Sequence, residues 1–130
     1  MTEQAERYDR IAEGYERWWA PVLAPSARAL LPHLDAAVAA GARGIVSAGT
    51  GAGRPTPGED AAFDRAGAQG VLICQGSRVG SGRSLRSPGL RKRGFVAADN
   101  LQPWKARLLL ALGLNLTSDP DVIQGYFDTY

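Results

Sequence analysis

The chain has 130 residues, of which 45% are hydrophobic and 22% are charged, enough for one compact domain. Its formal net charge of +2 is too small to indicate nucleic-acid binding, and no basic stripe is interleaved with aromatic residues that could stack bases. One cysteine and one histidine cannot form a zinc ligand set, and no apolar run is long enough to span a membrane. We therefore expect no metal, cofactor, nucleic-acid or membrane partner. The polar N-terminus has no apolar signal core, which favours the cytoplasm.

The first third of the chain is predicted to form two helices. Apolar residues recur at three- and four-residue spacing through the first 19 residues, which is typical of an amphipathic helix. Pro21 and Pro25 are expected to end this helix, because proline has no N–H donor and clashes with the preceding turn. A second helix is expected to begin near Pro25, to kink or restart at Pro32, and to end with Gly41 as its C-cap.

After Gly44 the pattern changes to strand, loop, helix and strand. Ile45–Val46 is predicted as a strand, residues 58–69 as a short helix, and Gly70–Cys74 as a second, apolar strand. This order predicts a parallel pair joined by a right-handed crossover. Cys74 is interpreted as a buried thiol. A long polar stretch without periodicity follows, and its arginine and lysine residues are interpreted as a solvated loop: Arg78, Arg83, Arg86, Arg91, Lys92 and Arg93.

The last third is predicted to add one strand and two helices. Phe95–Ala97 is the expected third strand, residues 102–114 form a helix that begins near Pro103, and Asp119–Pro120 caps a final helix. Trp104, Leu108 and Leu112 lie on one face of the first of these helices, and Trp18, Trp19 and Trp104 are expected to be core residues. The predicted fold is α/β, a small parallel sheet flanked by helices and preceded by an N-terminal amphipathic helix pair.

The glycine loop admits a cofactor interpretation. Gly49, Gly51 and Gly53 follow a strand at the spacing with which class I methyltransferases approach S-adenosylmethionine. The stretch "YDRIAEGYERWWAPVLAP" resembles the leader helix of that family. The acidic residues that the family places before the glycines and at the end of the next strand are missing here. A methyltransferase fragment is therefore an alternative interpretation.

A second resemblance covers nearly three quarters of the chain. From about Asp35 onward the sequence resembles the C-terminal domain of the bacterial L-asparaginase family, in the order "AAVAAGARGIVSAGTGAG", "AQGVLICQGSRVGSGR", "GFVAADNLQPWKARLLLALGL" and "DPDVIQGYFDTY". The segment from Gly94 to Tyr130 is the most specific. The resemblance divides the chain into a helical leader, residues 1–34, and an asparaginase-like domain, residues 35–130.

The resemblance implies a part of an enzyme rather than a whole one. The family hydrolyses L-asparagine to L-aspartate and ammonia with a threonine nucleophile that belongs to a larger N-terminal domain. That domain is not visible here, so the chain is expected to be a truncated, fused or split product that is inactive alone. A partner N-terminal domain or self-association is expected, and a non-catalytic assembly module is a further alternative.

The candidate substrate loop comprises four residues, and none is assigned a catalytic role: Thr50, Gly51, Gly53 and Arg54. Arg54 stands where the family has an asparagine that reaches a neighbouring subunit's active site. The stretch from Arg83 to Arg93 has no acid, although the family places a glutamate there. His33 is interpreted as a surface residue rather than a base. Without the N-terminal domain, the chain should expose apolar surface, and the first helix is expected to cover part of it.

Overall fold

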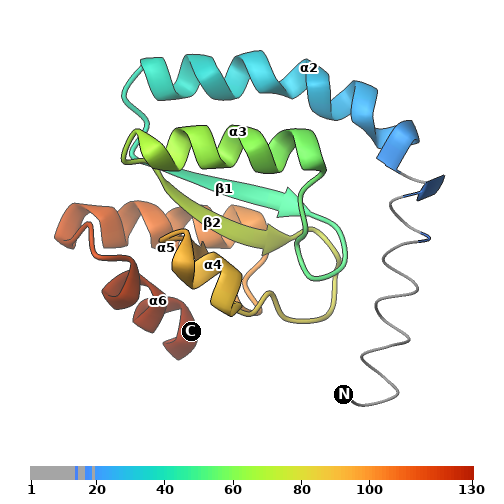
Figure 1. Ribbon diagram of the computed structural model, residues 1–130. Coiled ribbons are helices and arrows are strands. Elements are labelled where there is room, and N and C mark those ends of the chain that lie inside the picture. The colour runs from blue at the N-terminus through green and yellow to red at the C-terminus, as the bar shows by residue number, and fades with distance from the viewer. Residues whose placement is uncertain (1–13, 15–16, 19) are drawn as a thin grey trace.

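A computed structural model describes residues 14, 17–18 and 20–130. Its three strands form one parallel sheet in the order β1-β2-β3, with helices on both faces (Figure 1). This confirms the predicted small parallel α/β sheet flanked by helices. The first helix of the predicted N-terminal pair, with Trp19, lies largely outside the described residues. The elements are α2 (Ala20–Ala39), β1 (Gly44–Gly49), α3 (Pro57–Ala68), β2 (Leu72–Ser77), α4 (Pro88–Lys92), β3 (Val96–Ala97), α5 (Pro103–Leu116) and α6 (Pro120–Thr129).

The sheet separates two apolar clusters. On one face, Phe63 of α3 and Leu90 of α4 pack with Ile73 of β2, and α2 adds the half-buried Leu34. On the other face, α5 and α6 cover the sheet with residues such as Leu110 and Phe127. Figure 1 shows α2 and α3 stacked on one side of the strands and α5 and α6 on the other. Both faces of the parallel sheet are therefore covered, as this sheet type requires.

Helix α2 is continuous where breaks were predicted. The expectation that Pro21 and Pro25 end one helix is wrong, and so is a restart at Pro32, since α2 runs through all three prolines. A kink at Pro32 stays a prediction. The carbonyls that lose a partner to Pro25 and Pro32 belong to exposed residues, where water can take that place. The predicted division between residues 34 and 35 falls within α2, and a separate leader stays a prediction.

Local signals mark several other helix ends, and those predicted at Gly41 and Asp119 are confirmed. Gly41 has φ +89°, and the N–H groups of Gly41 and Ala42 donate to Val38 O and Ala37 O, the bonding of a glycine C-cap. Thr56 and Glu59 form a capping box at the start of α3. Asp119 caps α6 by accepting from two backbone amides. The short helix α4 was not predicted, because five residues are too few to show a period.

Helix α5 packs by the face opposite to the predicted one. Trp104, Leu108 and Leu112 are 62%, 59% and 65% exposed, so the expectation that Trp104 is a core residue is wrong, and Trp18 is also exposed. The buried face contains small residues that let α5 approach its neighbours closely. It comprises Ala106, Leu110, Gly113 and Leu114. The structure therefore leaves an apolar stripe on the outer side of α5, in line with the predicted exposed apolar surface.

Candidate functional site

The loops that follow the three strands meet at the carboxyl edge of the sheet. We call residues 50–54, 78–85 and 98–101 the carboxyl-edge loops. In parallel α/β sheets this edge is where ligands bind, because the loops there are held by rigid strands. All four candidate residues of the predicted substrate loop, from Thr50 to Arg54, lie in the first of these loops.

The glycine loop folds tightly back on itself. Thr50 and Arg54 form an isolated antiparallel bridge, and Gly53 N–H donates to Thr50 O at 2.9 Å. A Cβ atom on Gly49 would lie 2.4 Å from Gly53 O. Gly53 is buried at φ +83°, and a Cβ there would lie 2.7 Å from Gly76 O. These glycines are needed because backbone atoms occupy the space of a side chain.

Side chains from β2 and the loop after it fix the carbonyls of the glycine loop. Ser77 Oγ donates to Gly51 O at 2.6 Å, and Gln75 Nε2 donates to Ala52 O at 2.9 Å. Ser84 Oγ, which is fully buried, also donates to Ala52 O, at 3.1 Å. In the described part of the chain, no buried side-chain N or O atom lacks a hydrogen-bond partner. The loop is therefore held in one shape before any ligand arrives.

Asp99 connects the second and third carboxyl-edge loops. It is 7% exposed, has φ +53°, and exchanges two backbone hydrogen bonds with Ser84, at 2.8 and 3.0 Å. Both of its carboxylate oxygens accept from the Arg83 guanidinium. These hydrogen bonds lower the pKa of Asp99 below its usual range, outweighing the opposing effect of burial. Asp99 is thus an ionised structural anchor rather than a base near neutral pH.

The hydroxyl and carboxylate of Thr56 and Glu59, 2.9 Å apart, form the capping box of α3. His33 is exposed on α2, and burial raises the pKa of the Cys74 thiol, which makes a thiolate unavailable. Ser77 and Ser84 direct their hydroxyl hydrogens to backbone carbonyls. In residues 14, 17–18 and 20–130 no group of three His, Cys, Asp or Glu could hold a metal. No described helix is both long and apolar enough to cross a membrane.

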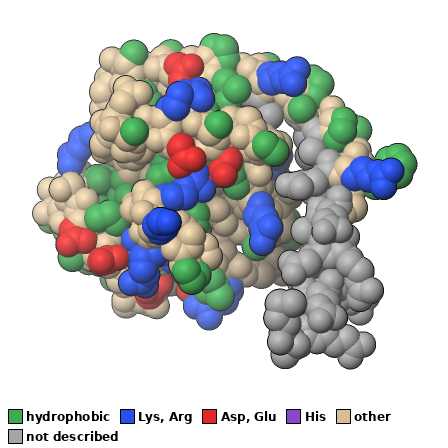
Figure 2. All heavy atoms as spheres, viewed as in Figure 1, with side chains coloured by type: hydrophobic (Ala, Val, Ile, Leu, Met, Phe, Trp, Pro, Cys, Tyr) green, Lys and Arg blue, Asp and Glu red, His purple; other side chains and the backbone are tan. Residues whose placement is uncertain are grey.

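Half of the predicted solvated arginine and lysine cluster is engaged in ion pairs. Arg93 donates to Asp60 and Asp64 on α3 at 2.7 and 2.8 Å. Arg86 donates to Phe95 O at 2.6 Å and to Asp121 on α6. Figure 2 shows basic and acidic side chains lying beside one another over α3 and α4. The interpretation of the run as a solvated loop is therefore wrong for Arg86 and Arg93, whose side chains are 5% and 27% exposed. Arg83 is 62% exposed and lies in a loop, as predicted, although it also pairs with Asp99.

Sequence reasoning found the glycine loop but missed the residues that hold it. A usable signal was present: polar residues end two apolar strands, at Gln75 and Ser77 in β2 and at Asp99 after β3. Because the carboxyl ends of parallel strands lie at one edge, such residues are expected to meet there. Ser84 and Arg83 carried no such signal, since they lie in an aperiodic segment.

Comparisons with known proteins agree with one of the two resemblances. The family model for the glutaminase/asparaginase C-terminal domain matches residues 26–127. The chain is 41% identical over 96 residues to L-asparaginase 2 of Bacillus subtilis (strain 168), covering 74% of this chain and 26% of that protein. It is 41% identical over 99 residues to the probable periplasmic L-asparaginase of Haemophilus influenzae, and the match covers 75% of this chain and 28% of that protein. It is 40% identical over 97 residues to the glutaminase-asparaginase of Acinetobacter glutaminasificans, and the match covers 70% of this chain and 28% of that protein.

The chain thus spans about a quarter of the length of the curated relatives it matches. These comparisons do not support the methyltransferase-like leader, and they do not favour the methyltransferase alternative. The family match also begins within α2, ahead of the position predicted from the resemblance.

Proposed function

The chain belongs to the glutaminase/asparaginase C-terminal domain family, and from this premise we propose that it acts as the C-terminal part of an L-asparaginase-type amide hydrolase. In this role it contributes one wall of a site whose nucleophile comes from a larger N-terminal part. Hydrolysis of L-asparagine to L-aspartate and ammonia is the reaction that the family resemblance implies. We expect residues 1–130 by themselves to be inactive.

The observation that carries this proposal is the rigid glycine loop in a family-matched domain. A wall that contacts substrate must keep its shape, because misplacement by about 1 Å can cost a hundredfold in rate. Gly53 has no room for a side chain, and the carbonyls of Gly51 and Ala52 are fixed by three side chains. Thr50 and Arg54 therefore project from a loop with one defined conformation.

The charge of this wall supports a particular orientation of substrate. Arg54 and Arg78 are exposed in the carboxyl-edge loops, and Asp99, which lies in the third of these loops, is already paired with Arg83. A guanidinium at position 54 attracts a carboxylate and repels an ammonium group. We therefore propose that the wall faces the carboxylate end of an amino-acid amide.

Fragment complementation tests the proposal. The 130-residue chain is mixed with the part of B. subtilis L-asparaginase 2 that precedes its matched region, and ammonia release from L-asparagine is measured. Activity that needs both polypeptides is the expected result. The Arg54→Asn variant, which restores the family's residue, should alter KM more than kcat because it changes a binding contact. Ammonia release by the chain alone, abolished by Thr50→Val, would show that the nucleophile lies here instead.

A further inference from the structure

The carboxyl-edge loops carry more positive than negative charge. They contain Arg54, Arg78 and Arg83 and a single acid, Asp99. Both carboxylate oxygens of Asp99 accept from Arg83, so this acid and this arginine neutralise each other. Arg54 and Arg78 are exposed, and neither forms an ion pair in the part of the chain that the structure describes. These loops therefore keep two uncompensated cations.

The two cations lie at the same end of neighbouring strands. Arg54 is bridged to Thr50, the residue that follows β1. Arg78 follows β2, and its N–H donates to the O atom of Gly49, the last residue of β1, at 2.9 Å. A ligand that contacts the glycine loop therefore meets a positively charged surface.

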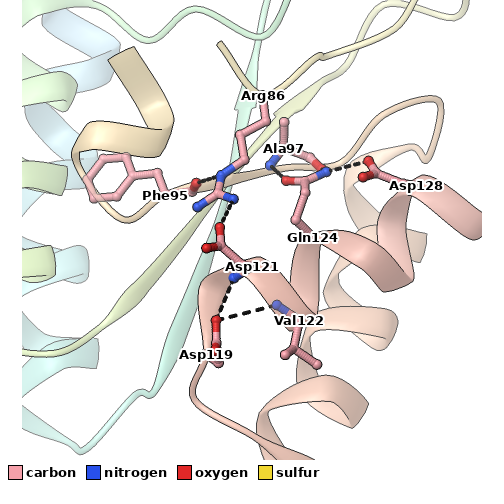
Figure 3. A network of polar contacts seen from close by, with 8 residues as sticks. All are labelled: Arg86, Phe95, Ala97, Asp119, Asp121, Val122, Gln124 and Asp128. Carbon is pink, nitrogen blue, oxygen red and sulfur yellow. Dashed lines mark hydrogen bonds and ion pairs between the residues drawn. The ribbon is translucent and has the colours of Figure 1, made fainter. Parts of the chain in front are cut away.

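No described acid is left to balance this charge. Asp121 accepts from Arg86, and Asp128 accepts from Gln124 Nε2 at 2.8 Å (Figure 3). The same side-chain amide accepts from Ala97 N–H at 2.8 Å and donates to Ala97 O at 3.2 Å. The remaining described acids cap helices or pair with arginine: Asp35, Glu59, Asp60, Asp64 and Asp119. The described part of the domain thus offers a partner to a carboxylate and none to an ammonium group.

This imbalance discriminates between amide substrates. L-asparagine carries its carboxylate and its ammonium on the same carbon atom, so a wall that faces one group is also close to the other. A guanidinium about 5 Å from an ammonium lowers affinity by about tenfold at an intermediate dielectric constant. The same guanidinium binds the carboxylate in either case. An amide without the ammonium therefore keeps the attraction and escapes the repulsion.

We propose that this chain shifts the specificity of the hydrolase that it completes toward monoamides of dicarboxylic acids that carry no ammonium group. This inference rests on the proposed function and names the substrate class of the same site. The reaction stays a hydrolysis: water adds to the amide carbonyl, the C–N bond breaks, the amide nitrogen leaves as ammonia, and a dicarboxylate remains. Arg54 is the residue that determines this specificity.

The probe is L-2-hydroxysuccinamate, in which a neutral hydroxyl replaces the ammonium of L-asparagine. Ammonia release from each compound is measured with the 130-residue chain and the part of B. subtilis L-asparaginase 2 that precedes its matched region. The ratio of kcat/KM for the probe to kcat/KM for L-asparagine does not depend on how much active complex forms. We expect this ratio to exceed that of intact B. subtilis L-asparaginase 2, which has the same N-terminal part, by at least about tenfold.

Two variants assign the preference to one charge. Arg54→Glu replaces the repulsion with an acid that pairs with the ammonium, and it should lower the ratio by at least about tenfold. Lys92→Glu makes the same change of charge at the end of α4, outside the carboxyl-edge loops, and it should change the ratio by less than about twofold.

Each outcome decides between the two proposals. A ratio equal to that of the intact relative would overturn the inference and leave the proposed function standing. A raised ratio that Arg54→Glu does not change, or that Lys92→Glu lowers equally, would also overturn it, because the preference would not come from the charge of this loop. Ammonia from neither compound would refute the proposed function and the inference with it. A raised ratio that Arg54→Glu alone lowers would support both.

Discussion

Replacing Gln124 with leucine tests whether one side chain closes the β3 edge. The change keeps the side-chain volume nearly constant but removes the hydrogen-bond partners of Ala97 N–H and Ala97 O. Ala97 and its neighbours Val96 and Ala98 are fully buried. Each orphaned backbone group costs about 1–3 kcal/mol, or about 2–6 kcal/mol for the pair. Leucine regains about 1–2 kcal/mol through its larger apolar surface. We therefore expect the free energy of unfolding to fall by about 3 kcal/mol, a large part of a typical total of about 5–15 kcal/mol.

Urea unfolding followed by circular dichroism measures this loss as a lower midpoint with an unchanged slope. Gln69→Leu is the matched control, because the Gln69 side chain is exposed and donates only to Arg65 O in the helix that it follows, α3. That variant should stay within about 0.5 kcal/mol of the parent. A loss for Gln124→Leu as small as that of the control would refute the reasoning, since it would mean that the Ala97 backbone groups are satisfied without Gln124.

Three further predictions concern the carboxyl edge and the core. Asp99→Asn keeps a residue that tolerates positive φ but removes the charge that Arg83 stabilises. Because the pKa of Asp99 is lowered in the folded state, its contribution is present above the unfolded pKa and is lost as pH falls through the folded pKa. The parent should therefore be more stable than this variant at pH 7, and the difference should shrink below about pH 4 in urea titrations. Gly53→Ala should lose about 2–4 kcal/mol, because it adds overpacking against Gly76 O to positive-φ strain. Gly51→Ala, which has positive φ but open space, should lose only about 1 kcal/mol, and equal losses would contradict the packing argument. Cys74 should react with a disulfide reagent only as fast as the chain opens, because burial raises its thiol pKa; rapid labelling of the folded chain would contradict this.

Much of the element order was predictable because it rests on local signals. The apolar runs around Ile45 and Ile73, separated by a capped helix, predict a parallel pair, and the structure confirms it. Gly41 and Asp119 mark helix ends through backbone geometry and capping that depend only on neighbouring residues. Prolines misled the prediction for α2, because the cost of a missing hydrogen bond is small where water can replace it.

The candidate site was predictable only in part. The glycine spacing from Gly49 to Gly53 located the loop, since glycine is required wherever backbones approach closely. The residues that hold the loop come from other segments, up to 32 positions away in the case of Ser84 and Ala52. A local sequence pattern cannot predict such a hydrogen bond, because the bond depends on how the strands are aligned across the sheet.

The sequence by itself determined the class of fold, the position of the glycine loop and the family. Only the tertiary structure decided which side of α5 is buried and which edge of the sheet a side chain covers. Residues 108–114 are apolar on nearly every side of that helix, so the spacing of hydrophobic residues does not indicate a single buried face. Contact with the sheet and α6 selects the face with Ala106 and Gly113, because only small residues allow that approach; a Cβ on Gly113 would already lie 3.3 Å from the Tyr126 ring. The same placement of α6 brings Gln124 to the backbone of β3.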